Sequence, residues 1–224
     1  MAEKNAPLLG IDLGTTRSVV AFVDADGKPE TIRNREGDLT TPSVVLFEEN
    51  ELTVGKEALK ALATLPGDVA SFVKREMGKE TFSSKFSGDS YSPELISASI
   101  LERLRMDAEA KFGCKVQKAV VSVPAYFDET KRLATINAGL LAGLDVVAII
   151  NEPTAAALAF AGSKLPQHGS GEGSDLNSET ILVYDLGGGT FDVSVVKLEG
   201  VDFVVQATDG NARLGGMDCD KCLA

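Results

Sequence analysis

The sequence contains one short pattern twice. Residues 8–23 read LLGIDLGTTRSVVAFV, and residues 181–198 read ILVYDLGGGTFDVSVVKL. In each copy an apolar run leads into Asp-Leu-Gly, then a tip rich in glycine or threonine, then a second β-branched run. This order is typical of a two-stranded hairpin. Because the copies lie much farther apart than the units of a solenoid repeat, they predict two related hairpins rather than a repeat array.

Both hairpin tips have the composition of a phosphate-binding loop. Glycine lets the backbone turn tightly and approach a ligand closely, and successive backbone N–H groups can converge on an anion. Asp12 and Asp185 hold matching places at the strand ends, where a carboxylate can bind a hydrated Mg²⁺. Two such loops facing each other would clamp the β- and γ-phosphates of a nucleotide. Ordinary glycine-containing hairpins are the plainer alternative, but the duplication favours phosphate binding.

Composition narrows the class of protein. The 224 residues are 44% hydrophobic and 25% charged, which suits one or two domains with a sizeable core. The net charge of −11 argues against non-specific nucleic-acid binding, so an anionic ligand must be held locally. No apolar run approaches the length of a membrane span, and the N-terminal MAEKNAPLL lacks a secretory core. A cytoplasmic protein with no membrane partner is expected.

Cysteine and histidine content excludes several kinds of catalysis. Cys219 and Cys222 form one Cys-x-x-Cys pair, without a second pair to complete a zinc site. Cys114 follows an expected helix end and is interpreted as a passive thiol. The single histidine, His168, lies in a loop rich in glycine and serine. Zinc or redox chemistry is therefore not expected, and Ser-His-Asp and Cys-His catalysis are excluded.

Local patterns predict alternating strands and helices. Beyond the two hairpins, strands are expected at 30–33, 44–47, 116–123, 146–150 and 201–208, and helices at 54–65, 68–77, 92–112, 128–142, 153–161 and 217–224. A short hairpin or irregular chain is expected at 79–91, a linker at 163–179 and a turn at 209–210. Ser92 is a suitable N-cap and Gly113 a suitable stop for the longest helix. The order of elements predicts an α/β fold with a parallel or mixed sheet covered by helices.

Five segments resemble the seventy-kilodalton heat-shock chaperones, the DnaK family. They are GIDLGTTRS at 10–18, VKREMGK at 73–79, VSVPAYFDETKR at 121–132, IINEPTAAALAF at 149–160 and DLGGGTFDVS at 185–194. Their order and spacing match too, over nearly the whole chain. The resemblance implies an actin-like (ribonuclease H-like) ATPase fold, with a lobe I core at 1–36 and 91–180 and an inserted subdomain at 37–90. Residues 181–224 would begin an incomplete lobe II.

The resemblance also implies residue roles. The first phosphate loop would be Gly14, Thr15, Thr16 and Arg17, and the second Gly187, Gly188, Gly189 and Thr190. Mg²⁺ would be held, largely through water, by Asp12, Asp185 and Glu152. Hydrolysis would depend on Lys74, Glu152, Asp185 and Thr190. The coupling of nucleotide state to a substrate domain would involve Pro124 and Arg132. The residues alone leave plainer alternatives: a surface lysine at 74, a helix N-terminal Glu152 favoured by the dipole, a strand end at Pro124, and a solvated helix face at Arg132.

The implied function is the ATPase part of a chaperone. Its ligands would be ATP or ADP with Mg²⁺, and K⁺ is a further candidate ion. Unfolded polypeptides, a J-domain co-chaperone and a nucleotide exchange factor would be its partners. A small-molecule kinase of the actin-like superfamily and a nucleotide-dependent assembly module are the alternatives. Arg17, Met217 and Cys219 depart from the family pattern. The isolated chain is expected to bind nucleotide weakly, and either to self-associate through open sheet edges or to be poorly ordered over 200–224.

Overall fold

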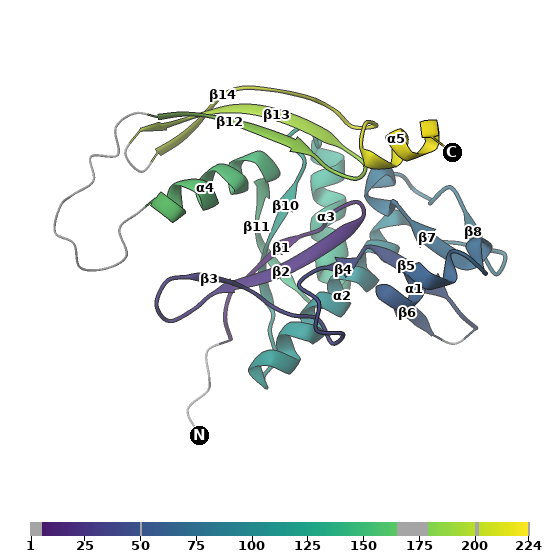
Figure 1. Cartoon of the computed structure of the whole chain (residues 1–224). Coiled ribbons are helices and arrows are strands. Elements are labelled where there is room, and N and C mark those ends of the chain that lie inside the picture. Colours follow the sequence, from purple (N-terminus) through teal and green to yellow (C-terminus); the bar gives the residue numbers. More distant parts are fainter. Residues whose placement is uncertain (1–5, 50, 165–178, 200–201, 224) are drawn as a thin grey trace. The chain divides into compact units, whose positions relative to one another are not determined.

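The computed structural model describes residues 6–49, 51–164, 179–199 and 202–223. The chain divides into two compact units (Figure 1). The first unit comprises residues 1–123 and 127–149, and the second comprises residues 124–126 and 150–224. Within the described residues no helix is long and apolar enough to cross a membrane.

The main sheet of the first unit is mixed. Its strand order is β11-β10-β1-β2-β3, and β4 also pairs with β2. These strands are β1 (Leu9–Asp12), β2 (Arg17–Val23), β3 (Pro29–Thr31), β4 (Thr41–Pro42), β10 (Lys118–Val123) and β11 (Asp145–Asn151). The first strand pairs parallel with β10 and antiparallel with β2. The mixed sheet and the first hairpin predicted from the sequence are therefore confirmed.

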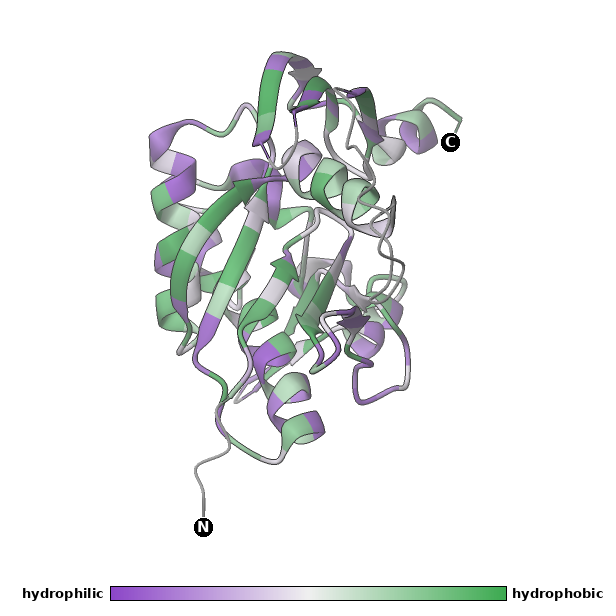
Figure 2. Cartoon of the chain, turned by 90° about the vertical axis from the view of Figure 1, so that its left-hand side faces the viewer, coloured by the Kyte–Doolittle hydropathy of each residue, from purple (hydrophilic) through white to green (hydrophobic). Residues whose placement is uncertain are grey.

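Two long helices accompany this sheet and pack against each other: α2 (Pro93–Phe112) and α3 (Glu129–Leu141). Each begins at a side-chain cap, since Ser92 Oγ accepts from the Leu95 amide at 3.1 Å and Asp128 Oδ1 accepts from the Lys131 amide at 2.9 Å. The first helix ends where Gly113 turns left-handed, at φ 66°. Figure 2 shows hydrophobic stretches along the strands and mixed hydropathy on the helices. Both helices are confirmed.

Between β4 and α2 lies a smaller layer with its own apolar cluster. Its sheet has the order β6-β5-β7, in which β6 is Leu52–Val54, β5 is Val44–Phe47 and β7 is Val69–Ser71. The helix α1 (Lys56–Ala61) covers it, burying Ala58 against Val44, Leu46 and Val69. A short hairpin, β8 (Lys85–Phe86) with β9 (Asp89–Ser90), follows, as the sequence allowed. Phe86 stacks on Phe47 with ring centroids 4.1 Å apart.

Two helix predictions in this layer are wrong: one helix is shorter than predicted, and a strand and a 3₁₀ turn replace the other. The one predicted at 54–65 is shortened to α1, because Val54 pairs in a strand and Gly55 follows at φ 101°. The one predicted at 68–77 is instead β7 followed by the 3₁₀ turn η2 (Val73–Glu76). Phe72, between them, has a left-handed φ of 59°, a conformation that a continuous right-handed helix cannot contain. A further 3₁₀ turn, η1 (Pro66–Asp68), precedes β7.

The second unit contains an antiparallel sheet with the order β12-β13-β14. Its strands are β12 (Glu179–Leu186), β13 (Phe191–Glu199) and β14 (Asp202–Asn211), and α4 (Glu152–Lys164) contacts all three. The last element is α5 (Gly216–Leu223). The central strand buries Val196 and Leu198. The second predicted hairpin is thus confirmed.

Several boundaries near the second unit differ from expectation. The strand predicted as buried at 146–150 is β11, which ends the main sheet and leaves Val147 47% exposed. The helix predicted to end at Gly162 runs on to Lys164. No turn interrupts β14 at 209–210, because both residues pair with β13. The expected linker lies almost entirely outside the described residues. Within the region 200–224, residues 202–211 form β14 and residues 216–223 form α5.

Candidate functional site

The first glycine-rich tip, residues 13–16, joins β1 to β2 and is tied to the chain around residues 40–43. The Ser43 amide donates to the Thr16 carbonyl at 3.0 Å. Beside it, the Arg17 guanidinium donates to Thr40 Oγ1 at 3.2 Å. The Thr15 side chain is buried. A tip fixed at several points needs little reorganisation when it binds a ligand, so less free energy is lost on ordering it.

Gly14 occupies a position that excludes any side chain. A Cβ built there would lie 2.0 Å from the Arg17 carbonyl oxygen, which is far inside van der Waals contact. The tight turn therefore depends on glycine at this position. The sequence-based interpretation of the tip as a close-approach loop agrees with this geometry.

Asp12 ends β1 and is held in place by a residue of β10. In the parallel register Asp12 lies beside Ser122, whose hydroxyl donates to Asp12 Oδ1 at 3.1 Å. Asp12 itself remains exposed. A fixed, solvent-facing carboxylate suits a hydrated divalent cation. The sequence analysis missed Ser122, because pairing between such distant strands cannot be read from local patterns; a serine inside a β-branched run was the only signal.

The second tip, residues 187–190, closes with a backbone hydrogen bond from the Gly187 amide to the Thr190 carbonyl at 2.9 Å. Thr190 and Gly189 are buried. Asp185 lies in β12 directly opposite Asp192 of β13, and Asp192 is only 2% exposed. Each hairpin therefore carries an acid near the end of its first strand and a four-residue tip before its second strand.

The second tip is also fastened to α5. The Gly216 amide donates to the Gly187 carbonyl and the Met217 amide to the Gly188 carbonyl, both at 3.0 Å. The two backbone segments approach so closely that a Cβ on Gly215 would lie 2.4 Å from the Gly189 nitrogen. These contacts hold the carbonyl side of the loop toward the helix start. The sequence analysis missed this support, although the consecutive glycines at 215–216 are the signal for a close backbone approach.

Lys74 and Glu152 are both at least partly shielded from solvent. Lys74 lies in η2, which packs against α2, and its side chain is only 6% exposed. The alternative of a solvated surface lysine is therefore wrong. Glu152 is the first residue of α4 and is half-buried. A carboxylate there is favoured by the helix dipole, which is compatible with both interpretations of this residue.

Pro124 and Arg132 lie on either side of the turn that leads from β10 into α3. Pro124 follows the strand directly and is buried. Arg132 is half-buried, and its Nε donates to the Phe127 carbonyl at 3.0 Å. The arginine fastens the start of α3 to the preceding turn.

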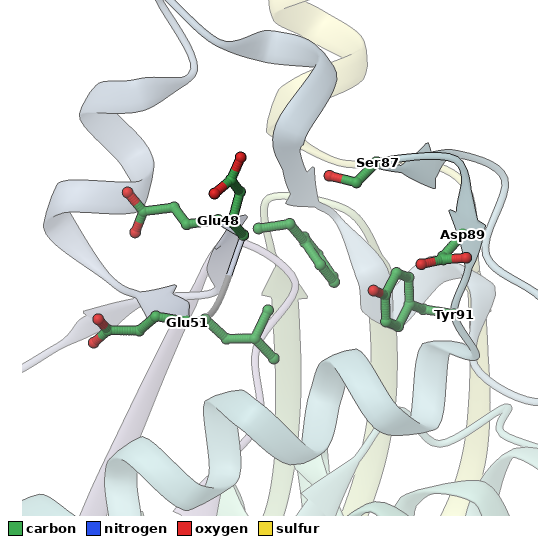
Figure 3. Close-up of a pocket in the computed structure, with 8 residues that line it drawn as sticks. Glu48, Glu51, Ser87, Asp89 and Tyr91 are labelled. Carbon is green, nitrogen blue, oxygen red and sulfur yellow. The ribbon is translucent and has the colours of Figure 1, made fainter.

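Outside these loops, a pocket of about 330 Å³ lies beside β3 and α2, and another of about 480 Å³ lies in the inserted layer (Figure 3). Its walls combine Phe47, Leu52 and Tyr91 with acidic side chains such as Glu48 and Asp89. It contains no residue that the sequence analysis placed in the site. Among the described residues, no three His, Cys, Asp or Glu side chains are grouped to hold a metal, so a cation at Asp12 would keep water ligands.

Comparison with known proteins identifies the family of this chain. The family model "Hsp70 protein" matches residues 8–86 and 79–224. The chain is 47% identical over its full length to a "Chaperone protein DnaK" of Thermotoga petrophila, covering 36% of that protein. Proteins of the same name from Mycoplasmopsis pulmonis and Halobacterium salinarum are 51% and 46% identical over 96% of the chain, which covers 34% and 32% of them.

These matches establish the family. The chain belongs to the Hsp70 family, which implies the actin-like ATPase fold. It spans about a third of the length of the curated relatives that it matches.

Proposed function

We propose that this chain is the nucleotide-binding part of an Hsp70 chaperone, which binds ATP or ADP with Mg²⁺ and contributes to ATP hydrolysis. The observation that carries the proposal is the pair of preorganised hairpin tips, each preceded by a strand-end acid, in a chain of this family. The matched relatives are all named chaperones, which favours this function over a small-molecule kinase or an assembly module.

The two tips are proposed to bind phosphate oxygens. Residues 14–17, at the first tip and the start of β2, and residues 187–190 of the second tip present glycine-containing backbone that can donate N–H groups to an anion. In the second tip, the carbonyls of Gly187 and Gly188 already accept hydrogen bonds from α5. This fixes the peptide planes of the loop before a ligand arrives. Donors fixed in advance stabilise developing charge without reorganisation.

The acids are proposed to hold the metal. Asp12, positioned by Ser122, would bind Mg²⁺ together with Asp185 and Glu152, largely through water. When bound, Mg²⁺ would neutralise charge on the phosphate oxygens. The chemistry of the donors fits, since carboxylate oxygens and water are the usual ligands of this cation. K⁺ is proposed as a further ion.

Hydrolysis in this proposal depends on positioning. The buried Lys74 would lie against the γ-phosphate, offset its negative charge and orient the attacking water. Asp185 or Glu152 would accept the proton from that water, and the Thr190 hydroxyl would contact the transferred group. A lysine shielded from solvent interacts more strongly with a phosphate than an exposed one does.

The remaining roles concern a protein of the relatives' full length. We propose a lobe I core at 1–36 and 91–180, an inserted subdomain at 37–90 and the start of lobe II at 181–224. Pro124 and Arg132 would transmit nucleotide state to a domain that binds unfolded polypeptides. A J-domain co-chaperone, a nucleotide exchange factor and a cytoplasmic location complete the proposal.

The first test is calorimetric titration of the 224-residue chain with ATP, with and without Mg²⁺. We expect weak binding that requires the metal and is lost in Asp12→Ala. The matched control is Asp26→Ala, which removes an exposed carboxylate from the turn after β2 and should leave binding unchanged. Absence of metal-dependent binding in the unaltered chain would refute nucleotide binding by this chain.

The second test concerns Lys74. In a protein of the relatives' length that contains this chain, Lys74→Ala should lower the rate of ATP hydrolysis by about 10²-fold or more while nucleotide binding persists. The matched control is Lys79→Ala, since Lys79 is exposed and forms an ion pair with Glu76. Single-turnover hydrolysis separates chemistry from binding. Equal turnover in both variants would remove Lys74 from the mechanism.

A further inference from the structure

Two thiols lie on one face of α5. Cys219 and Cys222 are three residues apart in this helix, and residues at that spacing are neighbours on a helix surface. Both are free and exposed. Helix geometry places their Cα atoms about 5 Å apart, which is within the range that disulfides bridge, roughly 4.4–6.8 Å. The pair is therefore accessible to a reagent and close enough to close on itself.

The same helix supports the second glycine-rich tip. Its first two residues, Gly216 and Met217, donate backbone hydrogen bonds to Gly187 and Gly188. The Asp218 carboxylate accepts from the Gly215 amide at 2.9 Å, which caps the start of the helix. A change in the shape of α5 therefore reaches the tip through two backbone hydrogen bonds and one close glycine contact.

We propose that Cys219 and Cys222 are a modification site for a low-molecular-weight disulfide of the glutathione class. The thiolate of one cysteine attacks the disulfide, forming a mixed disulfide and releasing one thiolate. The second cysteine then attacks the protein sulfur of that mixed disulfide, forming the Cys219–Cys222 bond and releasing the second thiolate. Two protein thiols are oxidised, their two protons go to solvent or to the leaving thiolates, and one small disulfide is reduced to two thiols.

The sequence alone predicts neither zinc nor redox chemistry here, because the Cys-x-x-Cys pair is isolated. The structure adds three facts that the motif lacks: a shared helix face, exposure of both thiols, and a backbone link to the tip at 187–190. Cys114, which follows α2 in the first unit, is only partly exposed.

Closing the bond must deform α5. In a regular helix the Cβ atoms of such a pair are about 5–6 Å apart, whereas a disulfide draws them to about 3.8 Å. The last turn of the helix must therefore tighten, and a strained disulfide is more easily reduced. The deformation would loosen the bonds from Gly216 and Met217 to the tip. The pair thus gives the loop a reversible chemical control.

The test uses the whole chain in a Cys114→Ser background, equilibrated with oxidised and reduced glutathione, trapped with acid and alkylated. Trypsin cleaves after Lys221, between the two cysteines. We expect the peptides 214–221 and 222–224 to remain joined until reduction, while the protein stays a monomer on a non-reducing gel. Cys222→Ser should give only a glutathione adduct at Cys219. Separate alkylated peptides, stable adducts on both cysteines, or disulfide-linked dimers would each overturn the proposal.

Hydrogen exchange tests the link to the tip without any nucleotide. Oxidation should make the amides of residues 186–191 and 215–218 exchange several-fold faster, and reduction should restore the original rates. In Cys222→Ser the same glutathione treatment should leave these rates unchanged. Unchanged exchange in the fully cross-linked chain would overturn the coupling. Since neither experiment contains ATP, their outcome is independent of the proposed nucleotide binding.

Discussion

At the scale of single residues, the first tip depends on glycine at position 14, because this residue has no Cβ atom. Gly14 leaves no space for a methyl group beside the Arg17 carbonyl, as its missing Cβ would lie 2.0 Å from that oxygen. Local sequence patterns identified this glycine as part of a tight loop, but the atom it would strike is known only from the folded turn. The distinction matters, because a flexible glycine tolerates alanine and a sterically required one does not.

Gly14→Ala is therefore expected to lower the free energy of unfolding by about 1–3 kcal/mol, since the turn must open to admit the side chain. Urea denaturation followed by circular dichroism measures this. The control is Gly67→Ala, because a Cβ on Gly67 would meet no atom within 4 Å. Its effect should stay within about 0.5 kcal/mol. Similar losses in both variants would contradict the steric argument.

At the scale of elements, one guanidinium joins three segments of the first unit. Arg103 of α2 is 7% exposed, and its Nε bonds to both oxygens of Asp107, at 3.2 and 3.1 Å. Its Nη2 reaches both oxygens of Glu36, at 2.9 and 2.8 Å. The Nη1 donates to the Val54 carbonyl of β6 at 3.4 Å. The guanidinium thereby joins the long helix to the loop before β4 through Glu36, and to the inserted layer through the Val54 carbonyl.

Arg103→Met should lower the free energy of unfolding by about 3–5 kcal/mol, because Glu36 loses its Arg103 partner and the buried Asp107 keeps only the more distant Arg35 guanidinium, at 3.7 Å. Chemical denaturation measures the loss. The control is Lys60→Met, which breaks the exposed pair with Glu57 and should cost less than about 1 kcal/mol. If the two variants lose equal stability, the Arg103 cluster does not hold the layers together.

Elements with strong local signals were predicted well, and elements set by distant contacts were not. The capped helix α2 and both hairpins follow from periodicity, caps and turn residues. The 3₁₀ turn at Val73–Glu76 depends on the left-handed Phe72, which no local pattern favours. The tips and Asp12 could be proposed as a site because their composition is unusual. Ser122 and the support from Gly216 were missed, because each acts through a contact between segments distant in sequence.

At the scale of the whole molecule, the sheet of the second unit has two strands with one neighbour each, β12 and β14. The outer strand β12 also exposes Leu182, Tyr184 and Leu186 on one face, at 65%, 65% and 51%. An edge strand with an exposed apolar row is prone to pair with another chain. The predicted self-association of this chain is assigned to this strand.

Sedimentation velocity at micromolar concentration should therefore show concentration-dependent association, and Leu182→Lys should shift the chain toward monomer. The matched control is Leu140→Lys, which charges an equally exposed leucine, 71%, on α3. It should leave the association unchanged. A monomeric unaltered chain over the whole concentration range would contradict the prediction.

The parallel pairing of β1 with β10 has a consequence for the order of assembly during synthesis. Asp12 meets Ser122 across a sequence separation of 110 residues, whereas the sheet β6-β5-β7 closes within residues 44–71. Contacts between neighbouring segments form sooner than distant ones. On the ribosome, the inserted layer can fold before β10, the parallel partner of Leu9 and Ile11, has been synthesised. Although β1 can already pair with β2, its other edge stays open until β10 has been made, and an open edge of an apolar strand invites aggregation.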